Sequence, residues 1–156
     1  MMNCSDEKIT ADPIKVVLVE KYPLARAALA RLLKDDGYEV YQAQNRQTAI
    51  KYTQALEDIS VLLVDLEMAG WRSVVRKAVR KHNAFVIAME GERAVSGTQH
   101  FKRRGIHVCL KKPIIYDAVR MAIRQKSKKV LPTQQKHTLV SAAQFIRSGS
   151  HWPSRN

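Results

Sequence analysis

Uninterrupted apolar runs alternate along this chain with stretches in which apolar residues recur every three or four positions. The clearest run is Val-Leu-Leu-Val at 61–64, which stops abruptly at Asp65. A run of this kind is typical of a strand buried on both faces, as in a parallel sheet. Ligands of open α/β sheets bind beyond the carboxyl ends of the strands, so Asp65 is a candidate site residue. The plainer alternative is that Asp65 only caps the strand or the next helix.

The whole pattern predicts five strands that alternate with five helices. We expect strands at 16–19, 38–40, 61–65, 84–89 and 106–110, and helices at 23–37, 45–56, 71–82, 91–105 and 114–126. Pro23 suits a first helical turn, Gly37 a helix end and Asn45 a helix cap. Strict alternation implies an α/β fold, with a parallel sheet, right-handed crossovers and helices on both faces.

Length favours a single domain with short appendages. We expect a disordered leader at 1–13, one folded domain at 14–126, and a basic C-terminal extension at 127–156 with one helix. No apolar run approaches the roughly 18 residues of a membrane span, and the polar start lacks the apolar segment of a signal peptide. The sequence therefore predicts a cytoplasmic protein without membrane contact. Two cysteines are too few for a disulfide framework or a cysteine metal site.

Charge is the unusual feature of the composition, with a formal net charge of +13. Every Asp and Glu precedes residue 126, so the cations of the extension are unopposed. Such a balance favours acidic partners, whether nucleic acid, acidic protein or anionic lipid, without choosing among them.

A basic patch stands out on the predicted helix 71–82. It comprises Arg72, Arg76, Lys77, Arg80 and Lys81. Such a run is usually a solvated face, and the functional alternative is a footprint for nucleic acid or an acidic protein. No helix-turn-helix, Gly-rich RNA-binding motif or aromatic stacking platform accompanies the patch, so base-specific recognition has no support.

Ionisable residues follow three of the predicted strands directly, as Glu20, Asp65 and Lys112. These residues lie in the segments Leu18–Lys21, Val64–Met68 and Leu110–Pro113. In this order and spacing, the segments resemble the receiver domain of bacterial response regulators over residues 15–125. The resemblance implies a flavodoxin-like doubly wound sheet with strand order 2-1-3-4-5.

The resemblance also implies roles for individual residues. Asp65 matches the aspartate that accepts a phosphoryl group, and Lys112 matches the lysine that neutralises phosphoryl charge. Pro113 matches a cis-proline that aims this lysine. Mg²⁺ would be held by Glu20, Asp65 and the backbone carbonyl of Glu67, with water completing its shell. The implied partners are a histidine kinase or phosphotransfer protein and a downstream protein target, with a homodimer left open. No enzymatic activity is expected beyond self-phosphorylation and slow self-dephosphorylation.

Three residues depart from the family pattern. Lys21 replaces the second member of an acidic pair, which should weaken Mg²⁺ binding; its ammonium would either neutralise Asp65 or point to solvent. Met89 stands where the family has a Ser or Thr that bonds the phosphoryl group, and it cannot donate a hydrogen bond. Cys109 replaces the aromatic residue of the family's switch and is too small to gate a motion.

These observations lead to the hypothesis of an atypical, or pseudo-receiver, domain in two-component signalling. Asp65 would be its phosphoacceptor, and its output would be contact with other proteins. The alternative is a phosphorylation-independent nucleic-acid or scaffold binder that kept the fold and uses its basic faces.

Overall fold

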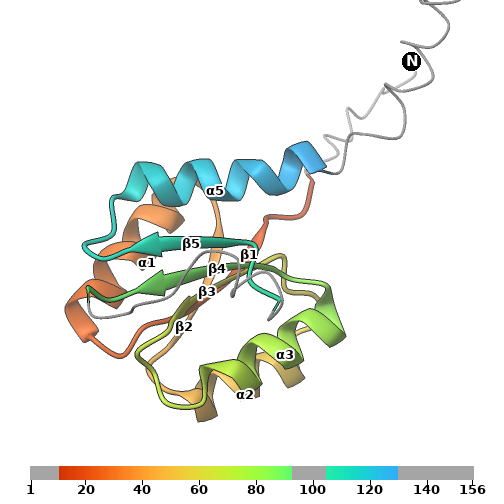
Figure 1. The fold of residues 1–156 in the computed structure, drawn as a ribbon. Helices are drawn as coiled ribbons and strands as arrows, with labels where there is room; N and C mark the ends of the chain where they lie inside the picture. The colour runs from red at the N-terminus through yellow and green to blue at the C-terminus, as the bar shows by residue number, and fades with distance from the viewer. Residues whose placement is uncertain (1–10, 93–104, 130–156) are drawn as a thin grey trace, which may run out of the picture.

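The computed structural model describes residues 11–92 and 105–129. They form a five-stranded parallel sheet in the order β2-β1-β3-β4-β5 (Figure 1), which confirms the predicted fold class and strand order. The strands are β1 (Lys15–Val19), β2 (Glu39–Ala43), β3 (Val61–Asp65), β4 (Phe85–Glu90) and β5 (Val108–Lys111). The helices are α1 (Pro23–Asp35), α2 (Arg46–Ala55), α3 (Trp71–His82) and α5 (Tyr116–Lys129).

Several predicted segments fall on residues outside this description. The predicted helix 91–105 lies mostly at 93–104, and most of the predicted leader and of the C-terminal extension also lies outside the described residues. Helix α5 continues to Lys129, three residues beyond the predicted domain end at 126. Within the described residues, none of the helices combines the length and the apolar character that crossing a membrane requires.

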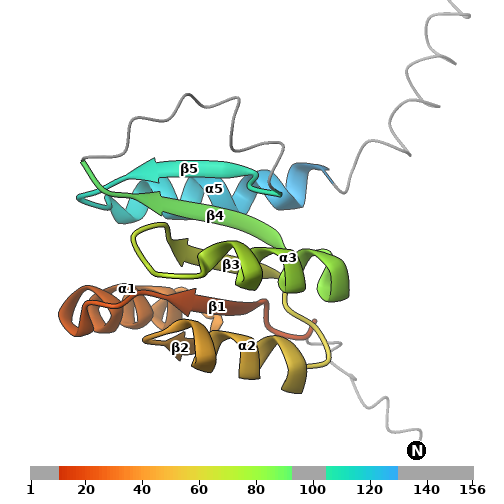
Figure 2. The same ribbon diagram turned by 60° about the horizontal axis from the view of Figure 1, so that its bottom comes forward.

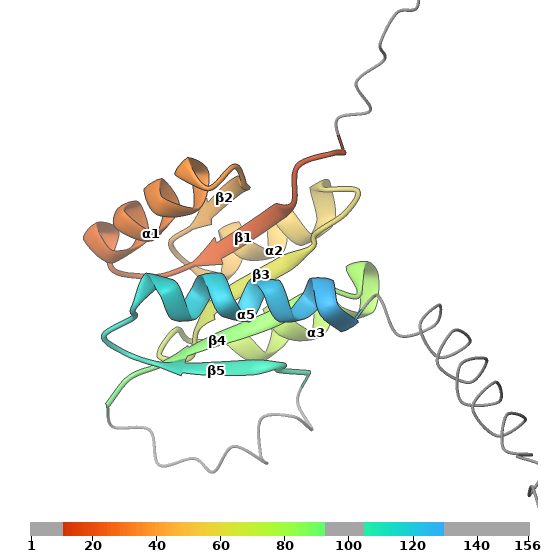
Figure 3. The same cartoon turned by 90° about the horizontal axis from the view of Figure 1, so that it is seen from above.

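Two apolar layers enclose the sheet, because successive side chains of a strand point to opposite faces. Helices α2 and α3 cover one face and helices α1 and α5 the other, as Figures 2 and 3 show from two sides. In β3, Leu62 packs toward α2 and α3, whereas Leu63 packs toward α1 and α5. Every residue of β3 is buried, which explains its uninterrupted apolar sequence.

The local signals in the sequence account for most helix ends. Pro23 occupies the first turn of α1, and Gly37 follows that helix with a φ of +90°. The Asn45 side chain caps α2 by accepting a hydrogen bond from the backbone N–H of Thr48 at 2.9 Å.

The strand expected at 106 and the helix expected at 114 each begin two residues later, because apolar character alone does not define backbone pairing. Ile106 is buried but precedes the first strand residue, Val108. Ile114 and Ile115 lie in a loop, and α5 begins only at Tyr116. Strand β4, by contrast, runs one residue further than predicted and ends at Glu90.

A polar cluster joins α1 to α5 across a long sequence separation. The Asp36 carboxylate accepts hydrogen bonds from the Tyr116 hydroxyl at 2.7 Å and from Nε and Nη2 of Arg120 at 2.9 and 3.1 Å. The Arg120 guanidinium, followed by the Tyr116 hydroxyl, lowers the pKa of Asp36 below its usual value. The cluster holds together the two helices that flank the carboxyl ends of β1 and β5.

Candidate functional site

Three charged residues from different strands meet at the carboxyl edge of the sheet. Glu20 follows β1, Asp65 ends β3 and Lys112 follows β5. Glu20 is 1% exposed and Asp65 is fully buried, so neither carboxylate can rely on bulk water for solvation. Buried charges need partners, and the apolar strands deliver both carboxylates to the same partner.

That partner is the Lys112 ammonium. Its Nζ lies 3.1 Å from Glu20 Oε2, 3.2 Å from Asp65 Oδ1 and 3.6 Å from Glu67 Oε2. Burial lowers the pKa of Lys112, but the hydrogen bond to Glu20 and the charge of Asp65 outweigh it, so the net pKa is raised. The lysine therefore stays cationic. The Lys112–Pro113 peptide bond is cis.

One carboxylate oxygen of Asp65 has no partner among the described residues. Glu20 Oε1 accepts a hydrogen bond from the Tyr22 backbone N–H at 3.0 Å, and Asp65 Oδ1 accepts one from the Glu67 N–H at 2.9 Å. Asp65 Oδ2 is buried and has no hydrogen-bond partner among the described residues. A buried acceptor of this kind is uncommon, and functional sites are one place where it persists.

Lys21 does not join the buried cluster. It is exposed, and its ammonium lies 4.8 Å from the centroid of the Tyr22 ring. Among the described residues, the ammonium group that pairs with Asp65 is that of Lys112. Of the two alternatives for Lys21, its exposure agrees with the one in which the side chain points to solvent.

Glu90 is a site residue that the sequence analysis missed. It is the last residue of β4 and is 3% exposed, and its Oε2 lies 3.5 Å from Cys109 Sγ on β5. Its Oε1 has no partner among the described residues. The signal was present in the sequence, because Glu90 ends an apolar run just as Asp65 does.

The two predicted switch positions have different surroundings. Met89 is fully buried in the apolar layer of α1 and α5, so its side chain belongs to the core. Cys109 packs against the opposite layer and contacts Glu90 rather than Met89. Burial, followed by the Glu90 charge, raises the pKa of the Cys109 thiol to about 11.

The donor set of the site fits a divalent cation held by few protein oxygens. Three carboxylates face the single Lys112 ammonium, which leaves an excess of negative charge, and Asp65 Oδ2 is an unpaired hard oxygen. Mg²⁺ accepts one or two carboxylates with water in the remaining positions. The described residues contain no group of three or more His, Cys, Asp or Glu side chains arranged to hold a metal, so a cation here would depend on water or on backbone oxygen.

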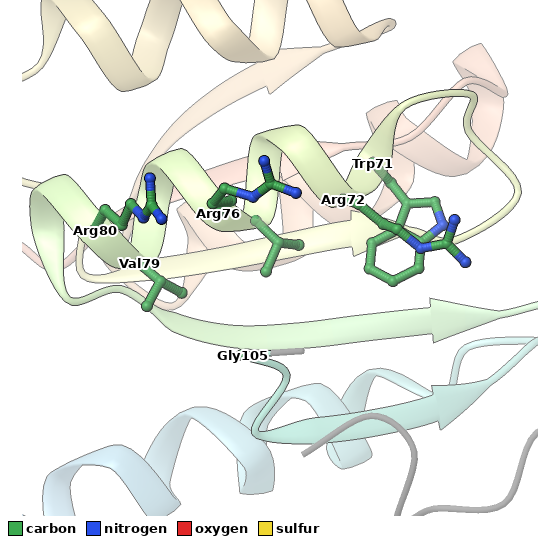
Figure 4. A pocket seen from close by; sticks show the side chains of 7 residues that line it. Trp71, Arg72, Arg76, Val79, Arg80 and Gly105 are labelled. Atoms are coloured by element: carbon green, nitrogen blue, oxygen red, sulfur yellow. The ribbon is translucent and has the colours of Figure 1, made fainter. Parts of the chain in front are cut away.

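The predicted basic patch lies on α3, and its residues make none of the ion pairs of the Lys112 cluster. Its five members are exposed: Arg72, Arg76, Lys77, Arg80 and Lys81. Arg72, Arg76 and Arg80 line one groove together with Trp71 (Figure 4).

Solved structures of similar fold include response regulator proteins and one protein described as an adenylate cyclase. An adenylate cyclase from Rhodopirellula baltica aligns with a TM-score of 0.68 and 21% identity, covering 83% of this chain and 98% of that one. A response regulator protein from Burkholderia pseudomallei with a phosphorylated aspartic acid, calcium ion and citrate has a TM-score of 0.65 and 22% identity, with coverages of 81% and 74%.

A third similar chain comes from the Saccharomyces cerevisiae co-crystal of the histidine phosphotransfer protein Ypd1 with the receiver domain of its downstream response regulator Ssk1. Its TM-score is 0.62 at 17% identity, with 71% of this chain and 86% of that chain covered. At such identities these likenesses show the fold alone.

Sequence comparison is decisive at the level of the family. No curated protein matches the chain. The model of the response regulator receiver domain, however, matches residues 16–124, which is most of the chain and includes every charged residue of the site. This chain therefore belongs to the response regulator receiver domain family of two-component signalling.

Proposed function

We propose that this chain is an atypical receiver that accepts a phosphoryl group on Asp65 and signals through contact with other proteins. The observation that carries the proposal is the position of the Lys112 ammonium, 3.2 Å from one oxygen of Asp65, while the other oxygen is buried and unpaired. A nucleophile and a fixed cation thus share one pocket, which is what phosphoryl transfer to a carboxylate requires.

The chemical step is a displacement at phosphorus. A carboxylate oxygen of Asp65 forms a bond to the phosphorus of a phosphohistidine while the N–P bond breaks, and its electron pair stays on the imidazole nitrogen. Lys112 holds positive charge where the phosphoryl oxygens arrive, as electrostatic stabilisation of such a step demands. Mg²⁺, when bound by Glu20, Asp65 and the Glu67 carbonyl, would supply further positive charge.

An apolar groove beside the site supports a protein as the phosphodonor. It has a volume of about 340 Å³ and is lined partly by Glu20 and Lys112 themselves. Two exposed, largely apolar side chains, Tyr22 and Leu32, also line it. We propose that the helix bearing the phosphohistidine docks here, because Glu20 and Lys112 line the groove and Lys112 also contacts Asp65. The co-crystallised phosphotransfer protein and receiver domain are consistent with such a donor.

Acetyl phosphate, which needs no docking surface, tests the acceptor. We expect the intact chain, incubated with acetyl phosphate and Mg²⁺, to gain the mass of one phosphoryl group in mass spectrometry. Asp65→Asn, which keeps the shape of the side chain, should gain none. An unchanged mass of the natural chain, or equal labelling of the Asp65→Asn variant, would refute the assignment of Asp65.

In this proposal, phosphorylation is not signalled by the switch of a Ser or Thr and an aromatic residue that the receiver family uses. Neither Met89 nor Glu90 carries a hydroxyl that could bond an aspartyl phosphate, and Cys109 has no ring to reorient. Glu90, which contacts Cys109, supplies no such group either, so we propose that the usual switch is absent.

Beryllofluoride, a mimic of the phosphoryl group, tests this readout. With beryllofluoride and Mg²⁺, the backbone amide NMR shifts of Asp65 and Lys112 should change, while those of residues 89–92 stay nearly constant. Saturable shifts of residues 89–92 that match those of Asp65 would show that an ordinary switch operates.

A further inference from the structure

Helix α3 carries a second charged surface that the phosphoryl site does not use. Arg72, Arg76 and Arg80 recur every four residues and line a groove of about 630 Å³ together with Trp71 (Figure 4). On a helix, this spacing places the three guanidinium groups along one side over roughly 12 Å. We propose that this α3 groove binds the phosphate backbone of single-stranded nucleic acid.

Within residues 11–92 and 105–129, the arginines of the α3 groove form no ion pair with an acidic side chain. The ion pairs among the described residues are made by Lys15, Lys112 and Arg120, none of which lies on α3. Lys81, on the same helix, donates to the Gln54 backbone carbonyl at 2.6 Å and so joins α3 to α2 instead. The groove therefore presents positive charge that the described part of the chain does not neutralise.

Of the three stretches outside the described residues, only 1–10 contains acidic residues, Asp6 and Glu7, and these stand beside Lys8. Residues 93–104, which follow β4, contain no Asp or Glu and add Arg93, Lys102, Arg103 and Arg104. Residues 130–156 also contain no acidic residue. Charge complementarity therefore favours an external polyanion over a segment of the same chain.

Val75 and Val79 also line the groove, but α3 lacks large exposed apolar anchors, and this favours nucleic acid over an acidic protein. Protein interfaces are built around exposed apolar anchors. The large exposed apolar residues among those described lie on or beside α1 and α5, not on α3: Tyr22, Leu24, Leu32, Ile115 and Met121.

Guanidinium groups bind phosphate in a planar, two-pronged manner. Binding to a single strand also combines a basic groove with an aromatic ring on which a base can stack. Although the sequence pattern indicates no stacking platform, the groove contains one aromatic ring among its lining residues, that of Trp71, which is partly buried and has the guanidinium carbon of Arg72 5.2 Å from its centroid.

Salt-dependent binding of a labelled oligonucleotide tests the proposal. The probe is a fluorescent single-stranded DNA of mixed sequence, titrated with the full chain at several NaCl concentrations and followed by anisotropy. The triple variant Arg72→Gln, Arg76→Gln, Arg80→Gln should reduce the slope of log affinity against log salt by about 2, since each phosphate contact on a single strand contributes about 0.7.

A matched control removes the same charge from the other face of the sheet. Arg31→Gln, Lys34→Gln and Lys128→Gln change exposed residues of α1 and α5 and should leave the slope unchanged. Circular dichroism checks that both variants fold. The proposal would be overturned if the natural chain does not bind the DNA, or if the α3 variant binds as well as the natural chain. An equal loss of binding in both variants would also overturn it. Displacement of the DNA by polyglutamate at equal charge would also overturn it, in favour of an acidic protein.

Discussion

At the scale of single residues, the site is organised by one ammonium among buried acids. Lys112 pairs with Glu20 and Asp65, whereas Lys21 lies exposed against Tyr22. The charge of Lys21 can still repel a cation at the nearby carboxylates, although its side chain does not enter the pocket.

Replacing Lys21 by aspartate should therefore strengthen Mg²⁺ binding. The local charge changes by two units, and even one unit at short range in surface-like dielectric is worth about 1 to 4 kcal/mol, so we expect at least a tenfold gain in affinity. Isothermal titration calorimetry measures it. Lys34→Asp makes the same charge change on α1 and should have little effect; equal gains in both variants would show that only net charge matters.

The thiol of Cys109 should be nearly inert in the folded protein. Burial, assisted by Glu90, raises its pKa from 9.0 to about 11. At pH 8 this lowers the thiolate fraction about 100-fold relative to the unfolded chain, and only thiolate is alkylated. A Cys4→Ser variant leaves Cys109 as the single thiol.

In that variant, iodoacetamide should label the unfolded chain about 100 times faster than the folded one, and labelling of the folded protein should accelerate as the pH rises toward 11. Mass spectrometry follows the reaction. Equal rates in the folded and urea-unfolded chain at pH 8 would contradict this environment for Cys109.

At the scale of elements, β3 is the part of the fold on which the rest depends. It pairs with β1 on one side and β4 on the other, and all its residues are buried. Leu63 packs under α1 and α5, while its neighbours Leu62 and Val64 pack under α2 and α3. The strand that presents Asp65 thus also joins the two layers.

Leu63→Ala should lower the free energy of unfolding by about 3 kcal/mol, because it opens a cavity in a packed layer. Leu24→Ala is the matched control, since Leu24 is 86% exposed and its truncation should cost less than about 0.5 kcal/mol. Urea unfolding monitored by circular dichroism gives both values. Similar losses at the two positions would mean that Leu63 is not part of a tight core.

At the scale of the whole molecule, charge is unevenly matched. A formal charge of +13 is opposed by few surface ion pairs among the described residues, so self-repulsion works against the compact state. The same imbalance makes a polyanionic partner favourable for the α3 groove.

Raising NaCl from about 20 to 200 mM should therefore raise the melting temperature, because the Debye length falls from roughly 20 to 7 Å and screens the repulsion. Differential scanning calorimetry measures the shift. The experiment uses chloride because sulfate stabilises proteins by a second effect, its exclusion from the protein surface. A melting temperature that falls with NaCl would show that the attractive pairs outweigh the repulsion.

Much of the site was predictable because its key residues stand at the ends of apolar runs. Glu20, Asp65 and Lys112 were identified in this way, and parallel topology brings such ends to one edge. Glu90 carried the same signal and was missed, because the resemblance to receivers directed attention to Met89. Its contact with Cys109 could not be foreseen, since side-chain neighbours on adjacent strands depend on register.

Hydrophobic periodicity by itself determined the order of strands and helices, and hence an α/β sheet buried on both faces. The reason is that the buried face of each element repeats with a period set by its local backbone geometry. Tertiary structure alone decided which charges meet. Lys112 rather than Lys21 faces Asp65, and Asp36 meets Arg120 across 84 positions. Such contacts depend on distances through space that strand register and helix packing set, and these distances are not encoded in any single stretch of sequence.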